Sequence, residues 1–374
     1  MVAEQPRVCY LIFAGHPKSG GGHFHSLRTT VECISERLRT KTINLGIKEV
    51  KLIAGLPEFE YIPVFRKTMI DDLRGLFRTV KQWRPDVLHA FDFKSLWVAR
   101  LLGAYLRLPV VYTKCGGRNG SNFIPNADAV VLFSGENYEH FERYGKLQGR
   151  LHLIPNRVNG PVIQDLRRIQ QLREKYDLWG KQVVLRIGRV HPYYRRTYEQ
   201  TLNLLSELRD ERNNMVVLFI GFVQDKSLYQ ELLKLTRDLP VVFVTEQQFT
   251  DKAAELIDVA DVCVTTGRGT MEAASLGKAT YCPQSNGTSP IPLSHGTLPA
   301  LLHYNFSERT VMEGPSPVLT VEEMQRQARE IFAKYFDLSH ALPVYTSIYR
   351  AVQTTPAKPI NFLLHSLRFL KSLR

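Results

Sequence analysis

Short apolar segments alternate with helix-like segments along most of this chain, and this pattern restricts the fold more than any other feature. The expected strands are residues 8–15, 48–55, 86–91, 109–114, 129–134, 151–156, 183–188, 216–221, 241–246, 260–266 and 279–283. Apolar residues at helical spacing predict helices at 27–38, 69–83 and 96–106. Buried strands that alternate with helices form parallel sheets with right-handed crossovers. The pattern therefore predicts an α/β protein with two successive doubly wound, Rossmann-like domains.

The length of 374 residues is sufficient for two domains, each with its own core. We expect an N-terminal domain at 1–162, a C-terminal domain at 163–340 and C-terminal helices at 341–374 that return to the N-terminal domain. The polar segment 159–181 is the expected linker. Ligands of parallel sheets bind beyond the carboxyl ends of the strands. The loops of the two domains should then face each other across a cleft, with one substrate held by each domain.

The net charge of +13 indicates an anionic partner such as nucleic acid, acidic lipid or a phosphorylated substrate. Nucleic acid is the weakest of these, because the sequence has no basic motif interleaved with aromatic residues. The five cysteines are widely spaced and include no CxxC pair, which argues against a disulfide framework and against a zinc site. A reducing, cytoplasmic location is expected. No segment offers the ~20 apolar residues needed to cross a bilayer.

Two loops carry the chemistry expected of a phosphate site. The run IGRVHPYYRR follows an apolar strand, with Gly188 and Arg189 at the turn and Arg195 and Arg196 at the start of a helix. Backbone N–H groups, guanidinium groups and a helix N-terminus together favour a diphosphate. The run TTGRGTMEAASLGKA repeats this arrangement with Glu272 in the first turn of a helix. Two such loops in one half of the chain indicate a nucleotide-sugar pocket.

Six motifs occur in an order that resembles a known enzyme family: GGGHFH, RPDVLHAFD, LIPNRVN, IGRVHPYYRR, ADVCVTT and MEAASLGKA. Together they resemble the GT-B glycosyltransferases of family 4, which are retaining and dependent on a nucleotide sugar, up to about residue 340. The resemblance implies a donor nucleotide-diphosphate sugar in the C-terminal domain and an acceptor in the N-terminal domain. It implies no cofactor and no obligatory metal.

The resemblance also implies roles for particular residues. Arg189 and either Arg195 or Arg196, with Arg196 preferred, correspond to the basic pair on the donor diphosphate, and Glu272 corresponds to the glutamate that binds the ribose. The other donor-binding candidates are Gly188, Arg268, Gly269 and Thr270, whose loop amides would assist with the diphosphate. Val264 stands where the family has its first glutamate, and Arg268 stands where an apolar residue is common. Both departures affect recognition of the donor sugar.

The N-terminal domain departs from the family as well. Lys114 or Cys115 stands where many relatives have a histidine near the transferred sugar, and a lysine cannot accept a hydrogen bond as a histidine can. His89 is a further catalytic candidate, at the end of the expected strand 86–91. The candidates for the acceptor side of the cleft are Gly21, Gly22, His23, His25 and Asp92. The HxH spacing of the two histidines has no third ligand in view, so no metal site is expected.

The C-terminal segment 360–373 has one broad apolar helical face, and no acidic residue occurs after Asp337. Such a helix could lie in an anionic membrane interface, where each basic residue contributes ~1 kcal/mol, or it could dock on the N-terminal domain. The segment 66–84 adds further basic residues: Arg66, Lys67, Arg74, Arg78, Lys81 and Arg84. A peripheral position on the inner face of the membrane and a lipid-linked acceptor would explain both features.

The sequence thus predicts a retaining glycosyltransferase that moves a sugar to a glycan or lipid-linked acceptor, in the synthesis of a cell-surface polysaccharide or glycolipid. Two alternatives remain. A non-hydrolysing sugar-nucleotide epimerase has the same two-domain architecture but needs acid and base groups at the reacting centre. A non-catalytic module of the same fold would bind an anionic glycan or nucleic acid through its charge, in a salt-dependent manner.

Overall fold

The computed structural model describes residues 5–17, 19–64, 68–119, 125–143, 150–208 and 214–354. The chain forms two compact units, the first made of Met1–Asn159 with Leu338–Arg374 and the second of Gly160–Asp337. We had expected these boundaries at residues 162 and 340, with a linker at 159–181. That segment instead contains helix α5 (Leu166–Lys175), which buries Ile169 and Leu172 in the core of the second unit. Residues 160–181 are therefore part of the second unit rather than a linker.

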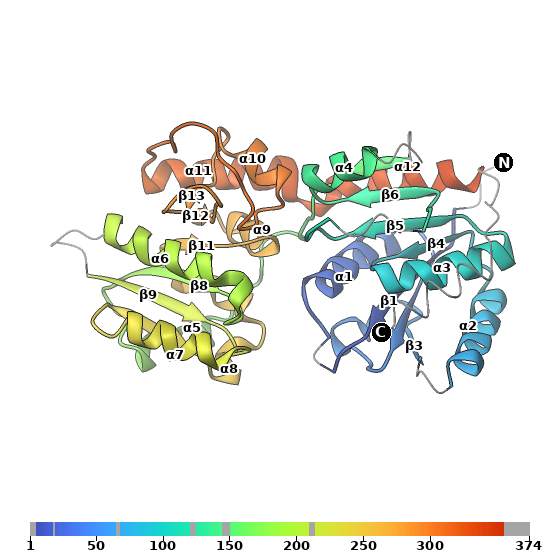
Figure 1. Cartoon of the computed structure of the whole chain (residues 1–374), viewed down its shortest axis with the longest axis horizontal. Helices are drawn as coiled ribbons and strands as arrows, with labels where there is room; N and C mark the ends of the chain where they lie inside the picture. Colours follow the sequence, from blue (N-terminus) through green and yellow to red (C-terminus); the bar gives the residue numbers. More distant parts are fainter. Residues whose placement is uncertain are drawn as a thin grey trace. The chain divides into compact units, whose positions relative to one another are not determined.

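In its described part, the first unit is built on a parallel sheet with the strand order β3-β2-β1-β4-β5-β6-β7 (Figure 1). The strands are β1 (Val8–Ala14), β2 (Thr40–Gly46), β3 (Glu60–Pro63), β4 (Val87–Ala90), β5 (Val110–Lys114), β6 (Ala129–Leu132) and β7 (Leu151–Leu153). Its helices are α1 (Gly22–Ser35), α2 (Met69–Trp83), α3 (Phe93–Leu106), α4 (Gly135–Glu142) and α12 (Ala341–Gln353), with the short η1 (Lys51–Ile53) and η5 (Leu338–His340). The strand order reverses direction between β1 and β4.

Both faces of the central strand β1 are covered by helices. Tyr10 and Ile12 pack in a cluster with α1 and α12, and Leu11 and Phe13 pack in a second cluster with α2 and α3. Successive side chains of a strand point to opposite faces of a sheet, so a strand covered on both faces is apolar throughout. This explains the continuous apolar run VCYLIFA of β1.

The second unit repeats the plan, with the strand order β10-β9-β8-β11-β12-β13 in the residues that the structure describes. The strands are β8 (Gln182–Ile187), β9 (Met215–Ile220), β10 (Val241–Val244), β11 (Val262–Val264), β12 (Ala279–Cys282) and the antiparallel β13 (Ile291–Pro292). Besides α5, its helical segments are η2 (Pro192–Tyr194), α6 (Arg195–Leu208), α7 (Lys226–Leu235), α8 (Gln247–Thr250), η3 (Ala253–Val259), α9 (Arg268–Ser275), α10 (Leu298–His303), α11 (Val321–Ile331) and η4 (Phe332–Phe336). The predicted fold class of two doubly wound, Rossmann-like domains is confirmed.

One expected strand is wrong. Residues 48–55 contain the 3-10 helix η1, and the strand beside β1 is β2. This strand was missed because polar residues occupy it, although Lys41, Thr42 and Asn44 are all buried. Asn44 explains the change of direction after the strand, since its Oδ1 accepts a hydrogen bond from the Val50 amide at 2.8 Å. The short strands β3 and β13 were not predicted either.

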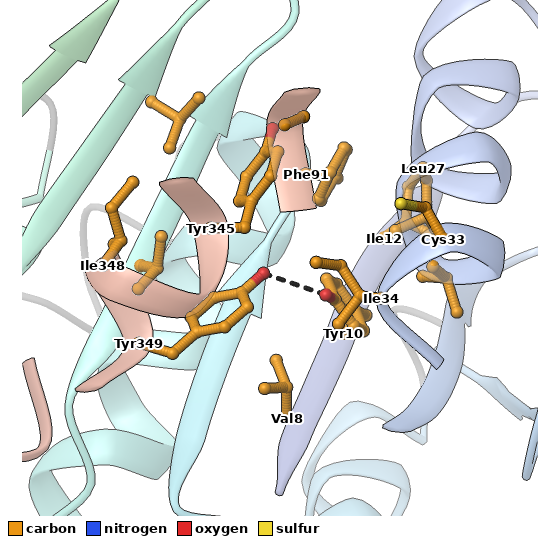
Figure 2. Packing of buried hydrophobic residues seen from close by; sticks show 14 of the residues in the cluster. Val8, Tyr10, Ile12, Leu27, Cys33, Ile34, Phe91, Tyr345, Ile348 and Tyr349 are labelled. Atoms are coloured by element: carbon orange, nitrogen blue, oxygen red, sulfur yellow. Dashed lines mark hydrogen bonds between the residues drawn. The ribbon is translucent and has the colours of Figure 1, made fainter. Parts of the chain in front are cut away.

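Helix α12 belongs to the first unit and is anchored there by buried hydroxyl groups. The Tyr349 hydroxyl lies 2.8 Å from the Tyr10 hydroxyl of β1 (Figure 2). The aromatic ring of Tyr345 and the side chain of Ile348 pack in the same cluster. Residues 338–354, the described chain after Asp337, therefore return to the first unit and complete its core.

Two features of the sequence fall outside the described residues: the amphipathic segment 360–373, and Arg66 and Lys67 of the basic segment. In the part of the chain that is described, no helix has the length and apolarity required to cross a bilayer.

Candidate functional site

The strand order of the second unit reverses between β8 and β11, and the loops after these two strands leave the sheet at this point. In doubly wound folds, ligands bind in the crevice at such a reversal, beyond the carboxyl ends of the strands. The loop after β8 contains Gly188 and Arg189, and the loop after β11 contains Thr265, Thr266 and Gly267. The topology therefore brings the two predicted phosphate loops to one edge of one sheet.

The turn after β8 is packed tightly against the end of β9. The Gly188 amide donates to the Ile220 carbonyl oxygen at 2.9 Å. A Cβ atom added to Gly221 would lie 1.9 Å from the Gly188 carbonyl oxygen. Only glycine fits at residue 221 with the turn in this position. The position of the Gly188–Arg189 turn is therefore fixed by the sheet beneath it.

Arg189 is exposed, and its guanidinium carbon lies 5.6 Å from the centre of the Tyr194 ring. A second guanidinium, that of Arg186 in β8, lies at the same distance from the same ring. A cation over an aromatic face is attracted by the ring quadrupole. Tyr194 thus holds two positive charges at the carboxyl end of β8.

Arg186 was not singled out from the sequence, although a charged residue inside the apolar run VVLRIG was a visible signal. Its side chain is 4% exposed. Nη1 donates to the Ile187 carbonyl oxygen at 2.6 Å, and Nη2 donates to Thr266 Oγ1 at 3.3 Å. The side chain therefore connects the loop after β8 with the loop after β11.

The structure separates the two arginines at the start of α6. Arg195 forms ion pairs with Glu231 of α7 and Glu199 of its own helix. Arg196 points to the loop after β12, where Nη1 donates to the Ser285 carbonyl oxygen at 2.5 Å. Arg195 is thus held against α7, whereas Arg196 lies beside a loop at the carboxyl edge of the sheet.

The N-terminus of α6 already carries a carboxylate. Glu308 Oε1 accepts hydrogen bonds from the Thr197 amide, at 2.7 Å, and from the Thr197 hydroxyl. An anion at this end of a helix is stabilised by the free N–H groups and the helix dipole. Burial raises the pKa of Glu308, and the hydrogen bonds from Thr197 act against this rise. We had expected this helix terminus to receive a phosphate, but the Thr197 amide is occupied by a protein group.

The first turn of α9 is closed by its own backbone. Gly267 has a φ of +54°, a conformation that favours glycine, and its amide donates to the Phe306 carbonyl oxygen. The Gly269 amide donates to the Thr266 carbonyl oxygen at 3.2 Å, and the Thr270 amide donates to that of Gly267 at 3.1 Å. We had expected the Gly269 and Thr270 amides to assist the diphosphate, but both are hydrogen-bonded within the turn.

Glu272 of α9 forms an ion pair with Arg268, whose Nε lies 2.8 Å from Glu272 Oε1. Burial raises the pKa of Glu272, and Arg268 acts in the opposite direction. The two residues follow the i,i+4 spacing at which helical side chains meet. Arg268, which stands where the family commonly has an apolar residue, is therefore paired with Glu272. Through this ion pair Arg268 orients the carboxylate that we expect to bind the ribose.

In the first unit, the reversal between β1 and β4 brings together the start of α1 and Asp92. Gly21 precedes α1 and Gly22 is its first residue, and a Cβ atom at either would meet nothing within 4 Å. His23 is close enough to Asp92 for the charge of that carboxylate to act on its ring, while His25 is exposed. The pKa of His23 is lowered by burial, and Asp92 acts against this shift. The start of α1 and Asp92 therefore lie at the same edge of this sheet.

The Asp92 carboxylate has a structural function. Oδ1 accepts a hydrogen bond from the Ser95 amide at 2.9 Å and completes a capping box at α3. Oδ2 accepts another from the Phe13 amide at 2.6 Å. An N-cap carboxylate satisfies backbone donors that a helix leaves unpaired. Asp92 therefore joins the ends of β1 and β4.

The predicted catalytic role of His89 is wrong. Its side chain is 0% exposed, and both ring nitrogens are occupied: Nδ1 lies 2.9 Å from the Tyr349 hydroxyl and Nε2 lies 2.7 Å from Thr113 Oγ1. Burial lowers the pKa of His89 to about 3. The residue ends a strand in the sequence, but its side chain points into the core below α12. A substrate cannot reach it.

Lys114 lies at the end of β5, and its side chain turns back on its own loop. Nζ donates to the carbonyl oxygens of Gly116 and Arg118, at 2.8 and 3.1 Å. Cys115 is packed against the core cluster of α1 and α12, and burial raises the pKa of its thiol. Lys114 thus holds the glycine-rich loop that follows β5.

The fold has been seen in other proteins, although no protein-family model and no curated protein matches this sequence. The HepE protein of Anabaena, in complex with UDP-glucose, is 15% identical with a TM-score of 0.65, over 92% of this chain and 100% of that chain. A glycosyltransferase from Rickettsia africae is 14% identical with a TM-score of 0.68, over 93% of this chain and 99% of that chain.

UDP-GlcNAc 2-epimerase from Methanocaldococcus jannaschii is also similar, at 12% identity and a TM-score of 0.54, over 92% of this chain and 99% of that chain. At these identities, the likeness establishes the fold. The chain has the two Rossmann-like units of GT-B proteins, as predicted from the sequence.

Proposed function

We propose that this protein is a glycosyltransferase that takes a sugar from a nucleotide-diphosphate donor bound by the second unit. The observation that carries the proposal is the position of Arg189. It is exposed on a rigid turn at the carboxyl end of β8, where the strand order reverses beside the loop after β11. The fold supports the proposal, since it is shared with a glycosyltransferase and with a protein crystallised with UDP-glucose.

In this proposal, Arg189 binds the diphosphate and neutralises the charge that develops on it when the glycosidic bond breaks. A charged donor aimed at the leaving group stabilises the transition state more than the ground state. Arg196 assists from the start of α6, and Glu272 accepts hydrogen bonds from the ribose hydroxyls. Arg268 orients Glu272 through their ion pair. The diphosphate is bound by side chains, because the Thr197, Gly269 and Thr270 amides have partners within the protein.

The first unit binds the acceptor in this proposal. Gly21, Gly22 and His23 lie at the carboxyl edge of its sheet, where ligands of such sheets bind. The acceptor is a glycan or a lipid-linked saccharide, and transfer proceeds with retention of anomeric configuration. NMR of the first product formed tests retention: an anomeric configuration opposite to that of the donor would exclude it.

The test of the proposed function is a panel of nucleotide sugars measured by thermal unfolding and then by transfer to candidate acceptors. A true donor stabilises the protein by about RT ln(1 + [L]/Kd), and Arg189→Ala should abolish this stabilisation. The matched control is Arg173→Met in α5, whose guanidinium donates to the Val259 carbonyl oxygen. Failure of every nucleotide sugar to bind, combined with salt-dependent binding of a polyanion, would favour a non-catalytic module.

Sugar-nucleotide epimerisation is the second candidate, because the fold is also that of UDP-GlcNAc 2-epimerase. This reaction needs groups that remove and return a proton. His89, which the sequence suggested as a catalytic residue of the transferase, is buried in the core of the first unit and cannot serve as such a group. Incubation with the donor alone separates the candidates, since an epimerase changes the donor sugar without any acceptor.

A further inference from the structure

Arg186 is buried without a counter-ion. Among the described residues, no carboxylate forms an ion pair with its guanidinium, and its Nε is buried with no hydrogen-bond partner there. A charge removed from water is costly unless it is paired and fully hydrogen-bonded. Burial accordingly lowers the pKa of Arg186. The hydrogen bonds of Arg186 and its contact with Tyr194 hold the side chain in place, but no ion pair balances its charge.

The first unit shows how this protein otherwise buries an arginine. Arg100 of α3 is 2% exposed and lies 3.6 Å from the carboxylate of Asp128. Arg100 and Arg186 are thus both buried, but only Arg100 has a carboxylate that balances its charge. What distinguishes Arg186 from Arg100 is therefore a buried positive charge without an ion-pair partner in the described protein.

The guanidinium of Arg186 lies directly beneath the proposed diphosphate turn. A Cβ atom added to Gly188 would be 3.0 Å from Nη2 of Arg186. Two hydrogen bonds, to the Ile187 carbonyl oxygen and to Thr266 Oγ1, tie it to both loops at the strand reversal. Arg189 shares the Tyr194 ring with it. Two cations close to one ring repel each other, and an anion nearby would offset this repulsion.

The carboxylate of Glu308 does not balance the charge of Arg186. Glu308 acts on Arg186 only through its longer-range charge, while its Oε1 is hydrogen-bonded to Thr197. The charge of Arg186 is therefore left available at the reversal between β8 and β11. A dianionic group above the Gly188 turn would neutralise it across a short, low-dielectric distance.

We propose that Arg186 is a positioning residue of the donor site, whose buried charge is balanced by the donor diphosphate and whose hydrogen bonds hold the two phosphate loops together. This inference rests on the proposed function and extends it to a residue that touches the substrate only through Gly188 and Arg189. The ligand-free protein carries the cost of the buried charge, and binding of a diphosphate offsets that cost.

The inference predicts opposite effects of one substitution on stability and on binding. Arg186→Met removes the unbalanced charge and leaves no carboxylate behind, so the Tm of the ligand-free protein should stay equal or rise. The affinity for UDP should fall by about tenfold or more, which corresponds to about 1.4 kcal/mol. By contrast, Arg100→Met leaves Asp128 buried without its partner, so it should lower the Tm and leave UDP affinity unchanged.

The experiment measures binding of UDP, GDP, ADP, CDP and pyrophosphate by calorimetry, and the ligand-free Tm. The proteins compared are the wild type, Arg186→Met, Arg186→Lys and the controls Arg100→Met and Arg173→Met. Arg186→Lys keeps the charge and should recover part of the lost affinity for both ligands. This recovery would not occur if residue 186 served packing alone. If Arg186→Met does not fold, the affinities of Arg186→Lys and the wild type for UDP and pyrophosphate are compared instead.

The outcomes separate this inference from the proposed function. If the wild type binds UDP and Arg186→Met binds it within about threefold, the inference is overturned and the proposed function stands. If Arg186→Lys binds as weakly as Arg186→Met, the inference is also overturned. If the wild type binds none of UDP, GDP, ADP and CDP, both are overturned. Weaker binding of UDP and pyrophosphate by Arg186→Met, with recovery in Arg186→Lys, supports the inference.

Discussion

The close approach of Gly221 to the Gly188 turn makes Gly221→Ala a direct test of the donor site. The added Cβ would lie 1.9 Å from the Gly188 carbonyl oxygen, whereas ordinary contact begins at 3.4 Å. The turn must therefore move by about 1.5 Å, or β9 must yield instead. Backbone hydrogen bonds from Gly188 to Ile220 and from Gly221 to Val244 oppose both movements. Residue 221 contacts the proposed substrate only through this turn.

Overpacking of this kind costs about 1–3 kcal/mol. For a unit of this size, each kcal/mol lowers the Tm by about 2–4 °C. A displacement of about 1 Å in a group that positions substrate can reduce the rate about 10²-fold, so kcat/KM for sugar transfer should fall by that order. Thermal unfolding and an initial-rate assay with the identified donor measure the two effects.

Gly296→Ala is the matched control in the same unit, because the nearest atom to its added Cβ would be Ser294 Oγ at 3.9 Å. It should change neither the Tm nor the rate. A Gly221→Ala protein that keeps wild-type kcat/KM despite a lowered Tm would refute the role of the Gly188 turn in donor binding.

Substitutions also test the buried hydrogen bonds that Tyr349 makes with Tyr10 and His89, and the role of Glu272 in ribose binding. Tyr349→Phe removes the hydrogen-bond partner of the buried Tyr10 hydroxyl and of His89 Nδ1, so denaturant unfolding should show a loss of about 2–4 kcal/mol, partly restored by adding Tyr10→Phe. Burial lowers the pKa of His89 from 6.5 in the unfolded chain to about 3 in the folded protein. The contribution of His89 to the free energy of unfolding should therefore be complete above pH 6.5 and fall by about 1.4 kcal/mol for each pH unit below it. His89→Gln should reduce the pH slope of the free energy of unfolding by one proton, and an unchanged slope would contradict the burial of a neutral His89. Glu272→Gln should weaken UDP binding but leave pyrophosphate binding unchanged in calorimetry, whereas equal losses for both ligands would show that Glu272 does not read the ribose.

The alternation of apolar strands and helices was sufficient to predict the fold class, because buried parallel strands must be apolar on both faces. It failed at β2, where Lys41, Thr42 and Asn44 are buried. A hydrogen bond from the Val50 amide to Asn44 and an ion pair between Lys41 and Glu60 compensate these polar groups. Such tertiary partners leave no periodic signal in the sequence.

The sequence predicted where the candidate site lies along the strands, but not which side chains are buried or paired. Gly188 and Arg189 lie at the carboxyl end of β8, where strand-end reasoning places a ligand. The same reasoning misplaced His89, because it gives the position of a residue along a strand and not the face to which its side chain points. Arg186 was missed for a related reason: whether a charged residue inside an apolar strand has a counter-ion depends on neighbours distant in sequence.

The central claim is that the second unit binds a diphosphate at the turn after β8. A crystal structure of the protein with UDP tests it most directly. We expect phosphate oxygens about 2.7–3.2 Å from the guanidinium nitrogens of Arg189, at the carboxyl ends of β8 and β11. UDP bound at the reversal between β1 and β4 of the first unit, with Arg189 in contact with no phosphate, would contradict it.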